Sequence, residues 1–182
     1  MILNIGVFQY KMRDETPFKK IQRLENHLKK NTILDLIVCP ELFLSGYGSH
    51  KKIKEFAEVK DGEYAIKISA LAKKYSTAIL YGYPEIEKDN LFNSAQLFSS
   101  KGQSLINHRK QLLPPTANES TIFNRGNNDS IINFKGIKIA VVICYELEFP
   151  ELIRKAALEG VKLIIAPTAQ SSHWPAAARH IS

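Results

Sequence analysis

The sequence predicts an α/β protein whose β-sheet mixes parallel and antiparallel strands. Apolar strand-like segments alternate with amphipathic helical segments along most of the chain, which is typical of an α/β layer fold. Two hairpin patterns interrupt this alternation, and hairpins pair their strands antiparallel. Because the chain has 182 residues, of which 45% are hydrophobic and 24% charged, we expect one globular domain over residues 1–182.

The strand predictions rest on apolar runs bounded by turn residues. These runs are residues 2–9, 33–40, 77–84 and 161–169. The first run has no basic lead-in and no small-residue cleavage site, so we interpret it as a strand and not as a signal peptide. No apolar run approaches the ~20 residues that a membrane-spanning helix needs, so no membrane partner is expected.

Three segments predict helices, at residues 16–31, 63–76 and 149–160. The first begins with Thr-Pro, a capping residue followed by proline in the first helical turn. The third has proline near its start and glycine just past its end. The residues that we expect on the buried faces are Phe18, Ile21, Leu24 and Leu28 in the first helix, and Ile66, Ala70 and Leu71 in the second.

Two further segments predict β-hairpins. Residues 91–110 carry two strand-like runs around residues 100–102, which are Ser-Lys-Gly, and residues 130–144 carry two runs around Lys135 and Gly136. The second hairpin ends in Ala-Val-Val-Ile-Cys. This pattern places Cys144 at the end of a buried strand, directly before the third predicted helix.

The net charge of +7 raises the question of nucleic-acid binding. The lysines come in pairs that begin at positions 19, 29, 51 and 73. No long basic stripe with interleaved aromatic residues and no nucleic-acid-binding motif is present. We therefore assign most of the charge to solvated helix faces and expect no nucleic-acid partner.

The two cysteines, Cys39 and Cys144, indicate a reducing setting. Neither lies in a CxxC motif or a cluster with histidine, so no zinc site is predicted. Cys39 lies within a predicted strand before Pro40 and is interpreted as a core residue. This cysteine usage favours a cytoplasmic location.

Three reactive side chains follow predicted strands. Glu41, Lys110 and Cys144 each come at the end of an apolar run, and α/β sheets bind ligands beyond the carboxyl ends of their strands. A thiol with an ordinary pKa near ~8.5 needs a base or a nearby positive charge to become a nucleophile. Glu41 could take its proton and Lys110 could stabilise the thiolate. The following helix N-terminus and the Tyr145 amide could stabilise negative charge.

Each of these residues has an ordinary structural alternative. Cys144 could be a small core residue, since free cysteine is often buried. Glu41 could be a solvated acid in a turn, and Lys110 could belong to a solvated basic run or contact a phosphate. A Cys–His pair with His108 or His173 is a further alternative, although nothing in the spacing marks either histidine. The residues alone leave these alternatives open.

Five blocks of sequence, taken together, resemble the nitrilase, or carbon–nitrogen hydrolase, superfamily. The blocks are CPELFLSGY (39–47), HRKQLLP (108–114), NESTIFNRG (118–126), ICYELEFPELIR (143–154) and GVKLIIAPTA (160–169). They occur in the family's order with plausible spacing. By this resemblance Glu41, Lys110 and Cys144 are the catalytic residues, and Glu119 holds Lys110 and contacts the substrate.

The resemblance implies an α-β-β-α sandwich that pairs into a homodimer or larger homo-oligomer, with no metal and no organic cofactor. It also implies that Cys144 attacks a small-molecule amide or nitrile to form an acyl-enzyme thioester. Glu41 would act as base and then acid, and Lys110 and the Tyr145 amide would stabilise the oxyanion.

The branch that the sequence resembles most is the amidase-like one. Tyr145 follows the cysteine where true nitrilases tend to have tryptophan, so a linear amide is favoured, while a carbamoyl substrate fits as well. Glu146 stands where aspartate is usual. The sequence ends before the family's C-terminal strands, so the expected sandwich is C-terminally incomplete. The alternatives that remain are a nitrilase or carbamoylase, an acyl-transferring or glutaminase-type member, and an inactive remnant.

Overall fold

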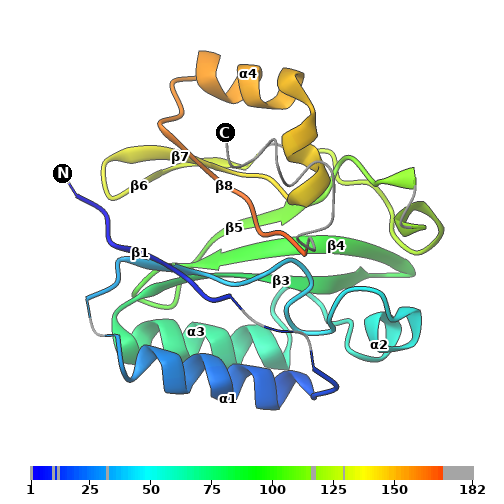
Figure 1. The fold of residues 1–182 in the computed structure, drawn as a ribbon, viewed down its shortest axis with the longest axis horizontal. Coiled ribbons are helices and arrows are strands. Elements are labelled where there is room, and N and C mark those ends of the chain that lie inside the picture. Colours follow the sequence, from blue (N-terminus) through cyan, green and yellow to red (C-terminus); the bar gives the residue numbers. More distant parts are fainter. Residues whose placement is uncertain are drawn as a thin grey trace.

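The computed structural model describes residues 2–9, 11, 13–31, 33–115, 118–128 and 130–169. Within them lie two β-sheets and the helices that flank them (Figure 1). The first sheet has the order β1-β2-β3-β4-β5, formed by Ile5–Val7, Leu36–Val38, Ala78–Glu87, Asn90–Phe98 and Ser104–Arg109. The second has the order β6-β7-β8, formed by Ile131–Phe134, Ile137–Val141 and Leu163–Ile165. The α-helices are α1 (Pro17–Leu28), α2 (His50–Glu55), α3 (Glu63–Tyr75) and α4 (Pro150–Leu158).

The elements stack in four layers, helix on sheet on sheet on helix. Figure 1 shows α1 and α3 below the five-stranded sheet, the second sheet above it, and α4 outermost. Side chains of a strand alternate between its two faces, and β2 follows this rule: Ile37 packs with the helices, whereas Leu36 packs with the second sheet. The predicted α-β-β-α sandwich is confirmed.

The two sheets enclose one apolar core and the helices another. The core between the sheets is formed by Leu36, Ala78, Leu80, Ala95, Leu97, Ile106, Phe134, Ile139, Val141, Ile143 and Ile165. The core under the helices includes Ile21, Leu24 and Leu28 of α1 and Ile68, Leu71 and Ala72 of α3. Cys39 is 1% exposed and belongs to this second core, as the sequence predicts.

Both helices differ from the prediction in which side chains they bury. Phe18 is 43% exposed and its ring contacts that of Tyr64 edge-on, 5.1 Å between centroids. Ile66 is 64% exposed, and Ala70 is exposed too. The expectation for these three residues is therefore wrong. The apolar residues of α3 form two overlapping stripes, and packing against the sheet selects the one that contains Ala65, Ile68 and Ala72.

The predicted hairpins are confirmed, and the structure adds one that was not predicted. Strands β4 and β5 pair antiparallel, as do β6 and β7. The predicted strand at residues 77–84 continues through Pro84 to Glu87, turns at Lys88 with φ +54°, and pairs with β4 over its length. Helix α2 is also new, because its polar, lysine-rich sequence has too little apolar periodicity to be recognised.

The mixed sheet brings several strand ends to one place. Strands β1, β2 and β3 run parallel, and two successive antiparallel pairings make β5 parallel to them. Glu41 follows β2 and Lys110 follows β5 directly. In the facing sheet, β7 leads to Cys144. The topology thus directs all three predicted catalytic residues toward one end of the sandwich.

Candidate active site

Glu41 begins a tight turn that is held against the neighbouring strand. Its side chain is buried, and the next residue, Leu42, has φ +47°. Gly82 on β3 lies directly against this turn: an added Cβ would come within 2.5 Å of the Leu42 nitrogen and 2.6 Å of the Pro40 oxygen. A glycine is therefore required at this position for the turn to approach the sheet so closely.

Lys110 is a fully buried cation between two carboxylates. Its Nζ donates to Glu41 Oε1 at 2.7 Å and to the two carboxylate oxygens of Glu119 at 2.9 and 3.1 Å. Burial acts to lower the pKa of Lys110, but the charges of Glu41 and Glu119 outweigh it, so its pKa is raised above the ordinary value. The side chain is therefore a permanent cation at neutral pH.

Further hydrogen bonds fix both carboxylates. Asn93 Nδ2 donates to Glu41 at 2.9 Å and to Glu119 at 3.3 Å, and the Tyr47 hydroxyl donates to Glu119 Oε1 at 2.7 Å. The amide of Ala169, past β8, donates to Glu41 Oε2 at 3.1 Å. The geometry leaves each carboxylate one defined orientation.

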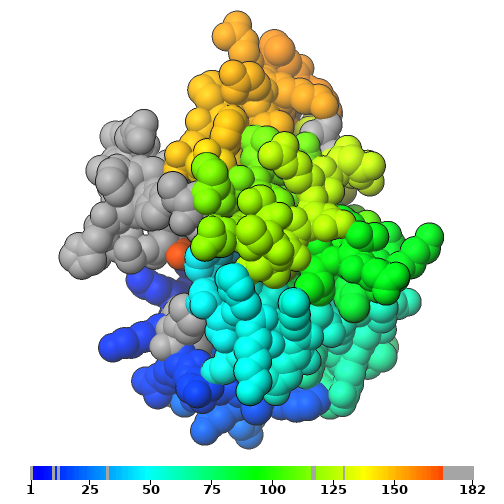
Figure 2. All heavy atoms as spheres, turned by 90° about the vertical axis from the view of Figure 1, so that its right-hand side faces the viewer, coloured from blue at the N-terminus to red at the C-terminus, as the bar shows by residue number. Residues whose placement is uncertain are grey.

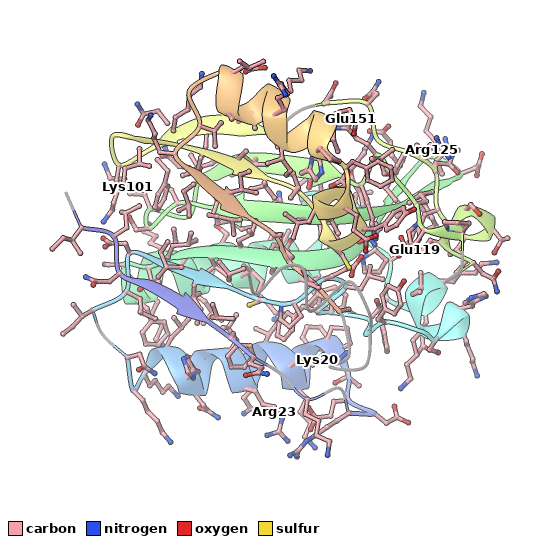
Figure 3. All side chains as sticks on the ribbon, turned by 45° about the horizontal axis from the view of Figure 1, so that its top comes forward. Lys20, Arg23, Lys101, Glu119, Arg125 and Glu151 are labelled. Carbon is pink, nitrogen blue, oxygen red and sulfur yellow. The ribbon has the colours of Figure 1, made fainter. Side chains whose placement is uncertain are left out.

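Glu119 reaches this cluster from a separate segment of the chain. It opens a short 3₁₀ helix, Glu119–Thr121, that packs against the region around α2 through an apolar cluster of Leu42, Ile53, Leu113 and Phe123. Figure 2 shows these two segments, cyan and yellow-green, side by side on one face. Figure 3 shows Glu119 pointing inward from this side.

Cys144 lies at a sharp turn between β7 and a 3₁₀ helix, Cys144–Glu148, that leads into α4. Its φ is +47°, a left-handed conformation that is uncommon for a residue other than glycine and often occurs at functional sites. Its amide donates to the Pro167 oxygen at 3.0 Å. The half-buried thiol is within reach of a hydrogen bond with Glu41 and of the charge of Lys110.

The protonation state of Cys144 differs from the expected thiolate. Burial raises the pKa of Cys144, and the negative charge of Glu41 raises it further, while Lys110 only partly offsets them. Lys110 therefore acts in the expected direction, but burial and the carboxylate of Glu41 at the same site outweigh it, so the net pKa of Cys144 is raised. Cys144 is a neutral thiol at rest, next to a carboxylate that can accept its proton.

The structure thus brings together Glu41, Lys110, Glu119 and Cys144, which come from four separate parts of the sequence. Tyr145 follows Cys144, and its ring packs edge-on against Phe149 with centroids 5.0 Å apart. His108 contacts Glu146 and Ser130, which is a structural role and not that of a base for Cys144. His173 lies outside the described residues.

A second buried network, which the sequence did not predict, connects the strand of Lys110 with the turn of Cys144. Glu146 Oε2 accepts from the Ile143 amide at 2.5 Å and lies 2.8 Å from His108 Nε2. Its Oε1 accepts from the Gln111 amide at 2.7 Å. Because Ile143 precedes Cys144 and Gln111 follows Lys110, Glu146 fixes the backbone on both sides of the site.

Replacing Glu146 with alanine should destabilise the fold strongly. The buried Ile143 amide, the partly buried Gln111 amide and the His108 ring would lose their acceptor, and each unsatisfied buried donor costs about 1–3 kcal/mol. We expect the free energy of unfolding, measured in urea, to fall by about 3 kcal/mol or more. Glu151→Ala removes an exposed acid on α4 (Figure 3) and should change stability by less than about 0.5 kcal/mol. Equal stability of the two variants would contradict the role of Glu146.

A pocket of 510 Å³ opens beside Glu41. It lies at the carboxyl ends of β1, β2 and β8 and is lined mainly by apolar residues, together with Tyr47, Thr168 and Lys20. This volume is in the range of pockets that hold small molecules.

In the described part of the chain, no group of three or more His, Cys, Asp or Glu side chains could hold a metal ion. The same residues contain no helix long and apolar enough to cross a membrane.

A family model described as carbon-nitrogen hydrolase matches residues 4–182. The chain belongs to this family. The resemblance inferred from five short blocks is thereby confirmed over nearly the whole sequence of this member of the carbon–nitrogen hydrolase family.

Comparison with individual relatives supports the same family. The chain is 39% identical over 170 residues to the hydrolase in the pqqF 5′ region of Pseudomonas protegens, which covers 92% of this chain and 59% of that protein. It is 28% identical over 174 residues to the 2-oxoglutaramate amidase of Bacillus subtilis, covering 94% and 65%. The chain therefore spans less than two thirds of the length of either relative.

Solved structures support the fold. An amidase from Nesterenkonia sp. AN1, in a mutant form with acrylamide added to its active-site cysteine, superimposes with a TM-score of 0.80. The match covers 97% of this chain and 70% of that one, at 21% sequence identity. At this identity the likeness establishes the shared fold.

Proposed function

We propose that this chain hydrolyses a C–N bond of a small linear amide, with Cys144 as nucleophile, Glu41 as general base and acid, and Lys110 as electrostatic stabiliser. The observation that carries the proposal is the buried contact of Lys110 with Glu41 and Glu119, directly beside the thiol of Cys144. A neutral thiol, a carboxylate in hydrogen-bond reach and a permanent cation are the parts that acyl transfer to sulfur needs.

The acylation step uses each group once. Glu41 takes the proton from the Cys144 thiol while sulfur attacks the amide carbon, and the carbonyl oxygen becomes an oxyanion. Lys110 and the Tyr145 amide stabilise this negative charge. When the C–N bond breaks, Glu41 gives the proton to the leaving nitrogen, so ammonia or an amine departs neutral. The product on the enzyme is a thioester at Cys144.

Hydrolysis of the thioester reverses the roles. Glu41 takes a proton from water while the water oxygen attacks the thioester carbon, and it returns that proton to the Cys144 sulfur as the C–S bond breaks. The acid leaves and the neutral thiol is restored. The raised pKa of Cys144 suits this cycle, because the resting state holds the proton that Glu41 must move.

The support for an amide over a nitrile is the Tyr145 that follows the nucleophile and the 2-oxoglutaramate amidase among the relatives. A carbamoyl amine remains a substrate class that the same steps would cleave. The single domain over residues 1–182, the homo-oligomeric state and the cytoplasmic location belong to the same proposal. Chain length supports the first, the family resemblance the second and the cysteine usage the third.

The test is a screen for ammonia release over short aliphatic amides, ω-amides, carbamoyl amines and nitriles. We expect turnover with at least one linear amide and none with nitriles. Alkylation by iodoacetamide, mapped by mass spectrometry, serves as the active-site control. Cys144 should react much faster than Cys39, because Cys39 is 1% exposed and has no acid–base partner among the described residues. No ammonia release together with equally slow labelling of both cysteines would favour the inactive remnant.

A further inference from the structure

Lys20 is a buried cation that the proposed reaction does not use. It lies in the first turns of α1 and is 1% exposed, although the preceding residue, Lys19, is exposed. Figure 3 shows Lys20 on the sheet side of α1, whereas Arg23 points away from it. Its Nζ donates to the Leu44 oxygen at 2.8 Å, in the turn that Glu41 begins. An ammonium group has three donors, and this is the one hydrogen bond it makes within the described residues.

Lys20 lines the same 510 Å³ pocket as Glu41. Among the described residues that line the pocket, it is the only cation, and most of the others are apolar, such as Phe8, Val38 and Phe43. The pocket therefore has Glu41, the residue whose buried carboxylate is the proposed base, as part of its wall and one positive charge elsewhere. This arrangement suits a ligand that is neutral where it reacts and anionic at another point.

The charged groups around Lys20 do not neutralise it. Glu15 pairs with Arg23, and Asp14 pairs with Lys52. No carboxylate in the described residues lies within ion-pair distance of Lys20. Burial lowers the pKa of Lys20 to about 8, and the positive charge of Lys52 on α2 adds to this, while Glu15 and Asp14 act in the opposite direction. A buried ammonium without a counter-ion is costly, and an anionic ligand would relieve that cost.

We propose that Lys20 binds a carboxylate carried by the amide substrate at a distance from the scissile C–N bond. This inference rests on the proposed function and makes it more specific: the preferred substrate class is a short ω-amide of a dicarboxylic acid. Lys20 would pair with the carboxylate at one end of the pocket while the amide lies beside Glu41 at the other. It acts on specificity and takes no part in bond breaking.

The test measures binding without turnover, by titration calorimetry on the full chain carrying Cys144→Ala. The probes are glutaramate, which has a carboxylate, and pentanamide, which has the same number of carbons and no charge. We expect glutaramate to bind more tightly. Adding Lys20→Met should weaken glutaramate binding by about tenfold or more, since a hydrogen bond to a charged group is lost, and change pentanamide binding less than twofold. Lys20→Arg, which keeps the charge, should restore most of the glutaramate affinity.

Equal loss of affinity for both probes would mean that Lys20 only holds the Leu44 turn, and no loss would mean that it does not contact the ligand. Either result overturns the proposal. If the Lys20→Met protein does not fold, the pH dependence of the Cys144→Ala protein decides. Between pH 7 and 9 Lys20 loses its proton, so glutaramate affinity should fall about tenfold while pentanamide affinity stays constant. A flat profile for glutaramate contradicts the proposal.

Failure of this inference can be told apart from failure of the proposed function. Lys20-dependent glutaramate binding without ammonia release from the parent protein would leave the anion site intact and refute hydrolysis. Ammonia release from neutral and anionic amides alike, unaffected by Lys20→Met, would refute the anion site and leave hydrolysis intact.

Discussion

Replacing Cys144 with alanine is expected to abolish amide hydrolysis, with kcat falling by about 10⁴-fold or more. The sulfur is the atom that would become acylated, and removing the nucleophile of such a unit eliminates nearly all of its rate enhancement. The side chain is half-buried at the end of the sandwich, so the fold should tolerate the change. The measurement is ammonia release under saturating amide, with thermal unfolding followed in parallel.

The outcome is informative only if the variant folds. We expect its unfolding midpoint to stay within a few degrees of the parent, because alanine removes one sulfur atom from a partly exposed position. Turnover of the Cys144→Ala protein at the parent rate would show that the thiol is not the nucleophile. Another group, such as a water molecule activated by Glu41, would then have to attack the amide.

Replacing Lys110 with methionine is expected to damage both activity and stability. Losing an oxyanion stabiliser typically lowers kcat by about 10²–10³-fold. The change also leaves Glu41 and Glu119 buried without their shared cation. Breaking a buried ion pair on one side costs about 3–5 kcal/mol, and we expect a loss of this size in the free energy of unfolding, measured in urea.

A double variant separates these two effects. Lys110→Met combined with Glu119→Gln removes one of the two unpaired negative charges, so it should be more stable than Lys110→Met alone. Its activity should remain low, because neither change restores the cation beside Cys144. Recovery of activity together with stability would mean that Lys110 serves only to hold the fold. If the double variant is no more stable than Lys110→Met, the instability of Lys110→Met does not come from the unpaired negative charges of Glu41 and Glu119.

The sequence predicted the three-residue centre because each member follows a strand and lies within an ordered block. Glu41, Lys110 and Cys144 are far apart in the chain, but the carboxyl ends of β2 and β5 lie at one edge of the first sheet, and β7 in the facing sheet leads to the same end. Strand direction alone is enough to place such residues close together. The four layers followed from the family resemblance, and the two cores between them bear that out.

Other features depend on contacts that a single sequence does not encode locally. Glu146 is a member of the nucleophile block, yet its bonds to His108 and Gln111 join segments more than 30 residues apart. Lys20 belongs to a lysine pair of the kind that usually lies on a solvated face. Its burial depends on where α1 meets the Leu44 turn. Likewise, the periodicity of α3 fits two faces equally well, so Ile66 was placed on the wrong one.

The direction in which the pKa of Cys144 is shifted could not be predicted from the sequence either. Sequence reasoning placed a cation and a carboxylate near the thiol, but the sign of the net effect depends on burial and on which charge lies closer. Burial raises the pKa of Cys144 and the negative charge of Glu41 raises it further, against the opposing effect of Lys110. Acylation is therefore expected to begin from the thiol, with proton transfer to Glu41 as part of the attack.

Formation of a thioester at Cys144 is most directly tested by turnover of a linear amide in the presence of hydroxylamine. If Cys144 is acylated, hydroxylamine attacks the thioester in competition with water. A hydroxamic acid should then appear beside the carboxylic acid, in a proportion that rises with hydroxylamine concentration. The Cys144→Ala protein should form neither product. Release of the carboxylic acid alone at every hydroxylamine concentration, or hydroxamic acid formation that persists in Cys144→Ala, would contradict a thioester at Cys144.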